Sequence, residues 1–241
     1  MEAIILASGI GKRLGVLGKK QPKCLLNLKR DIKIIDKLIN DLEGIKKINI
    51  VVGYKEDYIK NYLSKYKKKI RFISNKHYED KGNFYSVLIC KNKISDTLIL
   101  LDADIILPKD SLKKFINNKE KNLLMVNPKN SYNQDDIIVN LNRENCINKI
   151  FIKKKVNNLN TKFSSAGVIK MSLPASKVFF AELNHINKST NKNAYYEDSY
   201  KSLFNKIPFK IFTLIKERLE IDTAYDYENV KKIIKKNNAY L

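Results

Sequence analysis

Residues 3–14, Ala3-Ile4-Ile5-Leu6-Ala7-Ser8-Gly9-Ile10-Gly11-Lys12-Arg13-Leu14, decide the fold. The first five are wholly apolar, as expected of a strand covered on both faces. A Gly-rich basic loop over residues 8–20 follows, and such a turn lets backbone N–H groups approach a phosphate. It is not a P-loop, because Arg13 stands where Ser or Thr is needed, nor a dinucleotide fingerprint, because the third glycine comes one residue late, at Gly15. A plain surface turn is the alternative.

The chain continues as alternating strands and helices. Apolar runs predict strands at 48–52, 70–74 and 97–101, and helical spacing of apolar residues predicts helices at 34–42, 58–66 and 83–90. This βαβ series indicates an α/β fold with a parallel, doubly wound sheet. The second half is less regular, and we expect strands at 123–126, 137–141, 147–152, 166–170 and 209–215 and helices at 175–186, 196–204 and 227–234. Residues 128–134 and 156–161 are expected to form exposed loops.

Acidic side chains follow two of the predicted strands. Asp102 and Asp104 come at the end of the buried strand 97–101, where open α/β sheets bind ligands. Glu220-Ile221-Asp222 follows the strand at 209–215 and offers a second carboxylate to the same ion. Hard oxygen ligands of this kind suit Mg²⁺, which shares its coordination sphere with substrate phosphates. The alternatives are a solvated Asx turn at Asp102 and a helix N-cap at Asp222 or Thr223.

Composition excludes several classes of protein. With 241 residues, 44% of them hydrophobic, the chain is long enough to bury one large core. It has no run of 18 apolar residues, no basic leader at the N-terminus and only three cysteines without C-x-x-C spacing, so we expect a cytoplasmic protein that does not bind a membrane. The formal charge of +22 invites a nucleic-acid function. However, the basic residues are almost all lysines spread from end to end, which favours attraction of small anions.

Taken together, these motifs resemble the nucleotidyltransferase family that activates phosphorylated small molecules with NTP. The resemblance rests on residues 3–14, Pro22-Lys23, Leu101-Asp102-Ala103-Asp104 and Ile221-Asp222, and so runs nearly the whole chain. Within the family, the chain is most similar to bacterial choline-phosphate and aminoethylphosphonate cytidylyltransferases. This narrower match rests on Gly82-Asn83-Phe84-Tyr85-Ser86, Tyr195-Tyr196-Glu197-Asp198 and residues 221–227.

The resemblance implies a fold and a division of the chain. We expect a single Rossmann-like domain over 1–241 with a mixed, mostly parallel sheet, of the nucleotide-diphospho-sugar transferase type (GT-A-like). Residues 1–107 would form its nucleotide-binding half and residues 108–241 its acceptor-binding half. The implied partners are small molecules, CTP and an anionic acceptor that bears an amino group, with no nucleic acid or membrane. The resemblance leaves both a monomer and a homodimer open.

The resemblance also implies roles for individual residues. Lys23 and Arg13 would act on the phosphates, and Asp104 and Asp222 would be catalytic by holding Mg²⁺. Nucleotide contacts would come from the first loop, the segment before the third helix and the fourth strand: Leu6, Ala7, Ser8, Gly9, Gly11, Lys12, Arg13, Lys23, Gly82, Asn83, Ser86 and Asp102. The family most often has Ala where this chain has Ser8, and we expect that difference to change little, because the backbone makes the contacts there.

The acceptor is the least constrained part of the interpretation. A quaternary ammonium needs an aromatic cage, for which Tyr85, Tyr195 and Tyr196 are candidates, but the chain has no Trp. A primary ammonium needs carboxylates, for which Asp135 or Asp136 and Glu197 or Asp198 are candidates. Phosphocholine, phosphoethanolamine, 2-aminoethylphosphonate and amino-acid-derived acceptors therefore remain open. A sugar 1-phosphate is the alternative within the fold, and a non-catalytic nucleic-acid or anionic-surface binder is the alternative outside it.

Overall fold

The first strand is buried on both faces. In the computed structural model, which describes residues 1–66, 70–128, 136–152, 163–189 and 192–241, β1 (Glu2–Ala7) pairs in parallel with β4 (Lys47–Val52) and β6 (Leu98–Asp102). Successive side chains of a strand point to opposite faces of the sheet. Ile5 accordingly lies in one hydrophobic cluster and Ile4 in the other, and both are fully buried. This explains why the stretch at residues 3–7 is continuously apolar.

The central sheet has nine strands, and seven of them run in one direction. Its main path is β10-β9-β11-β6-β1-β4-β5, with β8 beside β11 and β12 beside β8. Only β10 and β11 run the opposite way. The strands not yet bounded are β5 (Ile70–Ser74), β8 (Leu123–Val126), β9 (Ile137–Leu141), β10 (Ile147–Ile152), β11 (Phe163–Met171) and β12 (Lys210–Thr213). The predicted mixed, mostly parallel sheet is confirmed.

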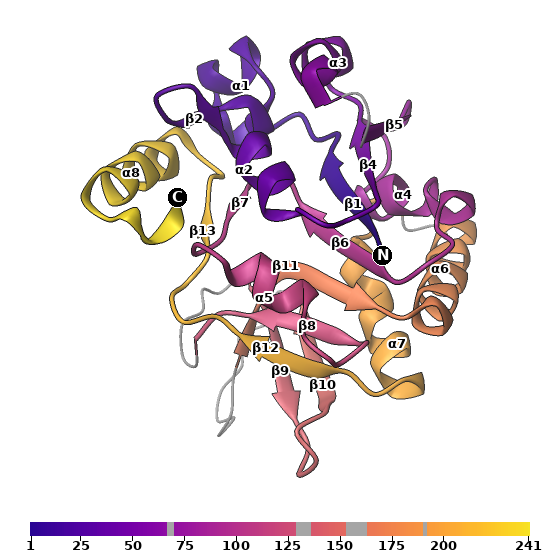
Figure 1. The fold of residues 1–241 in the computed structure, drawn as a ribbon. Coiled ribbons are helices and arrows are strands. Elements are labelled where there is room, and N and C mark those ends of the chain that lie inside the picture. The colour runs from indigo at the N-terminus through magenta and orange to yellow at the C-terminus, as the bar shows by residue number, and fades with distance from the viewer. Residues whose placement is uncertain (67–69, 129–135, 153–162, 190–191) are drawn as a thin grey trace.

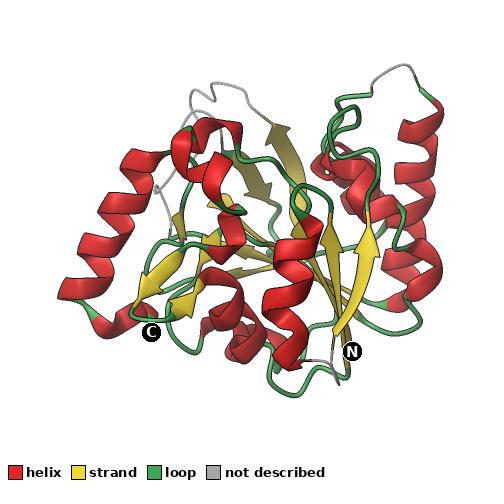
Figure 2. Ribbon diagram, turned by 90° about the horizontal axis from the view of Figure 1, so that it is seen from above, coloured by secondary structure: helices red, strands yellow, loops and turns green. Residues whose placement is uncertain are grey.

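Helices cover both faces of this sheet (Figure 2). The face to which Ile5 points is covered by α2 (Ile34–Asp41), α3 (Glu56–Leu63), α5 (Ser111–Ile116) and α8 (Ala224–Lys236). The face to which Ile4 points is covered by α4 (Asn83–Leu88), α6 (Leu173–Lys188) and α7 (Tyr200–Lys206). In Figure 1, α8 lies across the molecule from α6 and α7. The two clusters share the sheet, and strands from both halves of the chain build it.

Several short elements were not predicted. The loop predicted at residues 8–20 contains a 3-10 turn at Lys12–Leu14 and a helix, α1 (Val16–Lys20). Two two-stranded ribbons are added to the fold: β2 (Asn27–Lys29) with β3 (Ile32–Lys33), and β7 (Ile105–Ile106) with β13 (Leu219–Glu220). The first part of the helix predicted at 196–204 is a 3-10 turn over Tyr196–Ser199. Residues 129–134 and all of 156–161, predicted as loops, lie outside the described residues.

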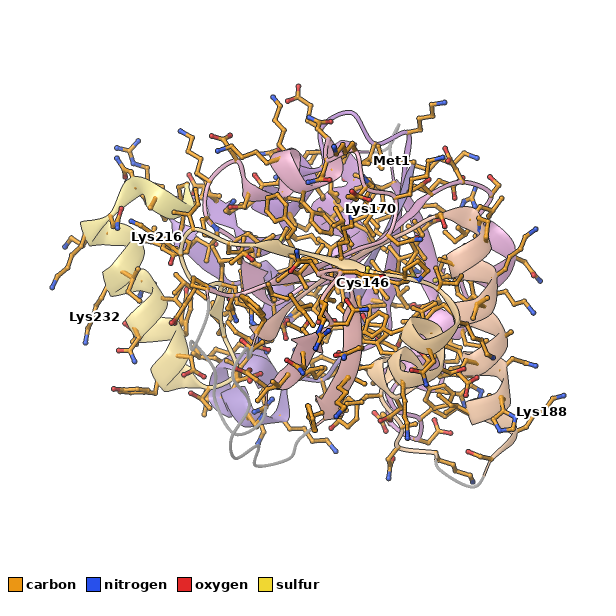
Figure 3. The ribbon with its side chains drawn as sticks, turned by 90° about the horizontal axis from the view of Figure 1, so that it is seen from below. Met1, Cys146, Lys170, Lys188, Lys216 and Lys232 are labelled. Atoms are coloured by element: carbon orange, nitrogen blue, oxygen red, sulfur yellow. The ribbon has the colours of Figure 1, made fainter. Side chains whose placement is uncertain are left out.

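The lysines labelled in Figure 3 lie apart from one another. Lys188, Lys216 and Lys232 lie at the outside of the molecule on different segments (Figure 3). Lys170 is buried instead, and its Nζ donates to the carbonyl oxygens of Ile116 and Asn118 at 3.0 and 2.8 Å. Within the described ranges, none of the helices combines the length and the apolar composition that crossing a bilayer requires.

Candidate active site

Three segments far apart in the chain meet at the carboxyl end of the central strands. Asp104 lies in the turn between β6 and β7, and β7 pairs with β13, so that Ile105 lies opposite Glu220. The backbone N–H of Ile221 donates to the carbonyl oxygen of Asp104 at 3.3 Å. This ribbon places residues 220–222 beside Asp104. The pairing of two short strands therefore sets the relative positions of the acidic side chains.

Lys23 joins two of the predicted carboxylates. Its Nζ donates to Asp104 Oδ2 at 2.7 Å and to Asp222 Oδ1 at 2.8 Å, and its side chain is 14% exposed. Arg13 Nη2 lies 2.9 Å from the same oxygen of Asp222. Burial alone would lower the pKa of Lys23, but the two carboxylates outweigh it and raise the pKa. Lys23 therefore stays protonated and positively charged. Lys23, Asp104 and Asp222 lie together, as expected from the sequence.

The acidic residues at this point also fit a divalent ion. Carboxylate oxygens of Asp104, Glu220 and Asp222 all lie within 4.8 Å of one another. Asp104 Oδ1 is buried and has no hydrogen-bond partner among the described residues. Three carboxylates with an unpaired buried oxygen match the hard oxygen ligands that Mg²⁺ prefers. The predicted ligand pair is thus joined by a third carboxylate, that of Glu220.

The side chain of Asp222 is not used as a helix cap. Thr223 is the N-cap of α8, and its hydroxyl accepts from the backbone N–H of Asp226 at 3.2 Å. Asp226 in turn accepts from the backbone N–H groups of Asp222 and Thr223 at 3.1 and 2.7 Å. Because this capping box satisfies the helix terminus, the Asp222 carboxylate remains free for Lys23, Arg13 and a metal.

A cavity of about 290 Å³ lies between the first loop, Lys23 and the acidic residues. Its lining includes the predicted residues Leu6, Ala7, Gly9, Gly11, Lys12, Arg13, Lys23, Asp104 and Asp222. Gly11 has φ of 67°, in the left-handed region that favours glycine, and this turn lets the loop fold back toward Lys23. Three cationic side chains at one cavity, Lys12, Arg13 and Lys23, are arranged to hold a polyanion.

A neighbouring cavity of about 220 Å³ extends from the same loop toward α4. Its lining includes Ser8, Gly9, Asn83, Ser86 and Asp102, all predicted to contact the nucleotide, together with Tyr78 and Lys81. Gly82 does not line the described cavities. Its backbone N–H donates to the carbonyl of Lys192 at 2.7 Å, and a Cβ at this position would come within 1.9 Å of the carbonyl oxygen of Ala194. The predicted nucleotide contact of Gly82 is therefore replaced by a close crossing of two backbone segments.

A third cavity, of about 680 Å³, opens on the other side of Asp104. It contains the predicted acceptor residues Asp136, Tyr195 and Glu197, and also Arg218 and Glu220. Tyr85 is not among its lining residues. The Tyr85 ring packs instead on His77 at 5.2 Å between centroids, with Lys81 Nζ 3.9 Å from the ring. Helical spacing explains the correction, because Asn83 and Ser86 face the site and Tyr85 lies on another side of α4. Asp135, the alternative to Asp136, lies outside the described residues.

The wall between the second and third cavities carries buried acidic groups. Tyr196 donates its hydroxyl to Asp102 Oδ2 at 3.1 Å. Burial, together with the nearby Asp104, Glu197 and Glu220, raises the pKa of Asp102 well above its usual range. Burial raises the pKa of Glu197 to about 7. Glu197 Oε2 is buried with no hydrogen-bond partner in the described part of the chain, so it can accept from a ligand.

Arg218 was not singled out by motif, and Glu220 stood in a quoted motif without a predicted role of its own. Arg218 is 14% exposed, and its Nη2 lies 2.7 Å from Glu220 Oε2 and 3.6 Å from Asp136 Oδ1. Its Nη1 donates to the carbonyl oxygen of Ser165 at 2.8 Å. The alternation Arg218, Glu220, Asp222 around the half-buried Leu219 and the buried Ile221 was the available signal, since residues two apart along an extended segment share a face.

The chain matches a family model and several known proteins. Residues 19–171 match the family described as Domain of unknown function (DUF6564). The CTP:phosphoglutamine cytidylyltransferase of Campylobacter jejuni is 41% identical over 135 residues, which cover 52% of each chain. The bifunctional protein GlmU of Methanococcus aeolicus is 30% identical over 180 residues, 74% of this chain and 41% of that protein. The match thus spans about half of the first relative and less of the second.

The fold has a solved counterpart over nearly its whole length. The CTP:phosphocholine cytidylyltransferase from Streptococcus pneumoniae superposes with a TM-score of 0.81 over 97% of this chain and 98% of that chain, at 23% identity. At that identity the similarity establishes the architecture, which agrees with the α/β fold predicted from the strand and helix pattern. The chain belongs to the family described as Domain of unknown function (DUF6564), and it has the nucleotidyltransferase fold that its motifs predict.

Proposed function

We propose that the protein is a Mg²⁺-dependent cytidylyltransferase. It would join CTP to a phosphorylated amino compound and release pyrophosphate. A phosphate acceptor would give a CDP-linked product, and a phosphonate acceptor a CMP-linked one. The observation that carries the proposal is Lys23, held between Asp104 and Asp222 where the cationic cavity and the acidic cavity meet. The names of the Campylobacter relative and of the Streptococcus neighbour support the choice of CTP.

The chemistry requires positioning and charge neutralisation. An oxygen of the acceptor phosphate is already anionic, so it attacks the α-phosphorus of CTP directly, and the bond to the β-phosphate oxygen breaks to release pyrophosphate. Lys12 and Arg13 would hold the triphosphate, and Lys23 would lie against the α-phosphate and the incoming phosphate together. Mg²⁺, held by Asp104, Glu220 and Asp222, would neutralise charge that develops on the phosphates. No Ser, Cys or His nucleophile is needed.

For the acceptor, the described residues favour a primary ammonium group. Asp136, Glu197 and Glu220 line the acceptor cavity, and the buried Glu197 Oε2 needs a hydrogen-bond donor. A primary ammonium donates such bonds and a trimethylammonium does not. Among the described lining residues Tyr195 is the aromatic one, since Tyr196 donates to Asp102 and Tyr85 packs on His77. Phosphoethanolamine, 2-aminoethylphosphonate and an amino-acid phosphate such as phosphoglutamine are therefore proposed ahead of phosphocholine.

A pyrophosphate-release screen tests the proposal. The purified full chain would be incubated with each of four NTPs and with phosphoethanolamine, 2-aminoethylphosphonate, phosphoglutamine, phosphocholine and several sugar 1-phosphates, with and without Mg²⁺. Release with CTP, Mg²⁺ and an amino-bearing acceptor supports it. Release with sugar phosphates alone would show that the protein is a sugar-1-phosphate nucleotidyltransferase. No release under any condition would refute the enzymatic function.

The assembly and the absence of macromolecular partners also belong to the proposal. We infer that the protein acts as a monomer or a homodimer, and the convergence of Lys23, Asp104 and Asp222 within one chain supports a site carried by that chain. The lysines are dispersed over several surfaces, which supports small anions as partners in preference to a nucleic acid (Figure 3).

A further inference from the structure

The cavity between the first loop and α4 carries a hydrogen-bond chain whose direction can be worked out. Ser8 Oγ lies 2.8 Å from Ser86 Oγ, and Ser86 Oγ accepts from Asn75 Nδ2 at 2.9 Å. Asn75 Oδ1 accepts from the backbone N–H of His77 at 2.8 Å. A backbone N–H can only donate, so His77 fixes the orientation of the Asn75 amide and leaves its NH₂ group facing Ser86.

The donor and acceptor of each following hydrogen bond, from Asn75 to the cavity, can then be assigned. Ser86 is 2% exposed, and within the described ranges its hydroxyl has two hydrogen-bond partners, Asn75 and Ser8. Because it accepts from Asn75 and a buried hydroxyl proton needs an acceptor, Ser86 donates to Ser8. Ser8 uses a lone pair for that bond, so its own proton is left over. Ser8 lines the cavity of about 220 Å³, and its hydroxyl therefore presents a donor there.

The side-chain amide of Asn83, beside this cavity, is also oriented with its NH₂ group available to donate. Asn83 Oδ1 accepts from the backbone N–H of Tyr196 at 2.9 Å, which leaves its NH₂ group as the available end. Cytosine offers two adjacent acceptors, O2 and N3, whereas uracil offers O2 next to an N3–H donor. The donor groups of Ser8 and Asn83 match the first pattern and oppose the second, since two donors that face each other are left unpaired.

We propose that Ser8 is a specificity-determining residue whose side-chain hydroxyl donates to N3 of cytosine and rejects the N3–H of uracil, and that Asn75 sets this polarity from outside the cavity. The inference rests on the proposed function for the placement of the nucleotide. It also revises the expectation that the identity of residue 8 matters little, because here the side chain and not only the backbone faces the base.

Calorimetric binding of CTP and UTP to the full chain, with Mg²⁺ and without acceptor, tests the inference. Ser8→Ala should raise the Kd for CTP on the order of 10-fold, as expected for one lost hydrogen bond, and should not raise the Kd for UTP, because the donor that opposes the uracil N3–H is removed. Ser176→Ala is the matched control, because Ser176 is equally buried but bonds to Leu173 in α6, away from the cavities. Equal losses for both nucleotides in Ser8→Ala would overturn the proposal.

Asn75→Asp tests the polarity itself. The aspartate keeps the bond from the His77 N–H but cannot donate when ionised, so Ser86 would donate to it and Ser8 would donate to Ser86. Ser8 would then present a lone pair to the cavity, and the preference should shift from CTP toward UTP by about tenfold at pH 8.5. An unshifted preference in a variant that melts within a few degrees of the wild type would refute the chain of donors. Since binding needs no turnover, these results stay separate from those of the pyrophosphate screen.

Discussion

At the scale of single residues, Lys23 has two roles that depend on the same contacts. Its ammonium group neutralises Asp104 and Asp222 in the free protein and lies where the substrate phosphates are proposed to meet. A buried cation that is paired twice is held in one geometry at little further cost when a substrate arrives. The same pairing makes the two carboxylates dependent on Lys23 for their charge balance.

Replacement of Lys23 by Met should abolish most of the activity without unfolding the protein. We expect kcat to fall on the order of 10²–10⁴-fold, because a preorganised charge at the reacting phosphates is lost. Mg²⁺ should raise the melting temperature of the variant more than that of the wild type, because the carboxylates have lost their cation. Lys46→Met, at an exposed lysine, is the control. Turnover near the wild-type rate would remove Lys23 from the mechanism.

Glu197 should make stability depend on pH in a defined direction. Its pKa is raised to about 7 in the folded protein, above the ordinary value of 4.5. As pH rises from about 4.5 to 7, the unfolded chain releases this proton while the folded chain retains it, so the wild type loses stability over this interval and stays lower above it. Urea denaturation of wild type and Glu197→Gln at pH 5 and pH 8 should show that the variant gains relative stability at pH 8. An equal difference at both pH values would contradict the shift.

The same residue should affect the acceptor. Below pH 7 the protonated Glu197 no longer attracts an ammonium group, so KM for an amino-bearing acceptor should rise on acidification in the wild type and remain nearly flat in Glu197→Gln. The KM for CTP is the internal control, because Glu197 does not line the cationic cavity.

Sequence patterns located the charged residues of the site but not all their partners. Asp104 and Asp222 could be found because each stands in a motif that follows a strand, and Lys23 because Pro22-Lys23 matches the family that the motifs resemble. Arg218 was missed because a guanidinium beside a strand is common on any surface, and Glu220 was in a quoted motif in which the ligand role was given to Asp222 alone. Tyr85 was misplaced because the helical phase of α4 relative to the cavity depends on how α4 packs on β1 and α6, which a local pattern does not contain.

At the scale of elements, the N-terminus of α8 positions the end of the site. Asp226 accepts from the backbone N–H groups of Asp222 and Thr223 and from the Thr223 hydroxyl, at 2.7 to 3.1 Å. The helix cap and the proposed metal ligand Asp222 are therefore joined through one carboxylate, although Asp226 does not line the described cavities.

Removal of the Asp226 carboxylate should lower both the stability of the protein and its apparent affinity for Mg²⁺. Asp226→Ala should lower the free energy of unfolding by about 1 kcal/mol, which is typical of a lost cap. The Mg²⁺ concentration for half-maximal activity should rise several-fold, because the backbone of Asp222 is no longer held. Glu228→Ala, in the same helix and paired with exposed Lys231, is the control. A loss of stability with an unchanged Mg²⁺ requirement would show that the cap and the site are independent.

Long elements could be predicted and short ones could not. Strands such as β1 and β4 are recognisable because both faces are buried, which leaves a continuous apolar run. By contrast, α1 has five residues and α5 has six, too few to show a helical period. The ribbon of β7 with β13 joins two residues to two others more than a hundred positions away, so it is visible only after the chain has folded.

At the scale of the whole molecule, one sheet separates two hydrophobic clusters. Every long strand near the centre contributes to both, as Ile4 and Ile5 do in β1. The proposed nucleotide-binding half, 1–107, and acceptor-binding half, 108–241, meet where β6 pairs with β11. Loss of either cluster would expose the strands that support the other.

We therefore predict that the two halves unfold together. Thermal denaturation should give one transition, with coincident midpoints by far-UV circular dichroism and by tyrosine fluorescence, which is usable because the chain has no tryptophan. CTP with Mg²⁺ should shift this single midpoint upward. Two separated transitions would show instead that 1–107 and 108–241 are independent folding units.

The crossing at Gly82 has a consequence for attempts to alter the acceptor. The backbone of residues 192–194 lies so close to Gly82 that no side chain fits there, and Asn83 then holds the N–H of Tyr196. Hybrid proteins that exchange the acceptor segment between relatives would thus have to carry both sides of this junction together. A hybrid that takes residues 192–198 from one parent and residues 81–86 from another risks a steric mismatch between them.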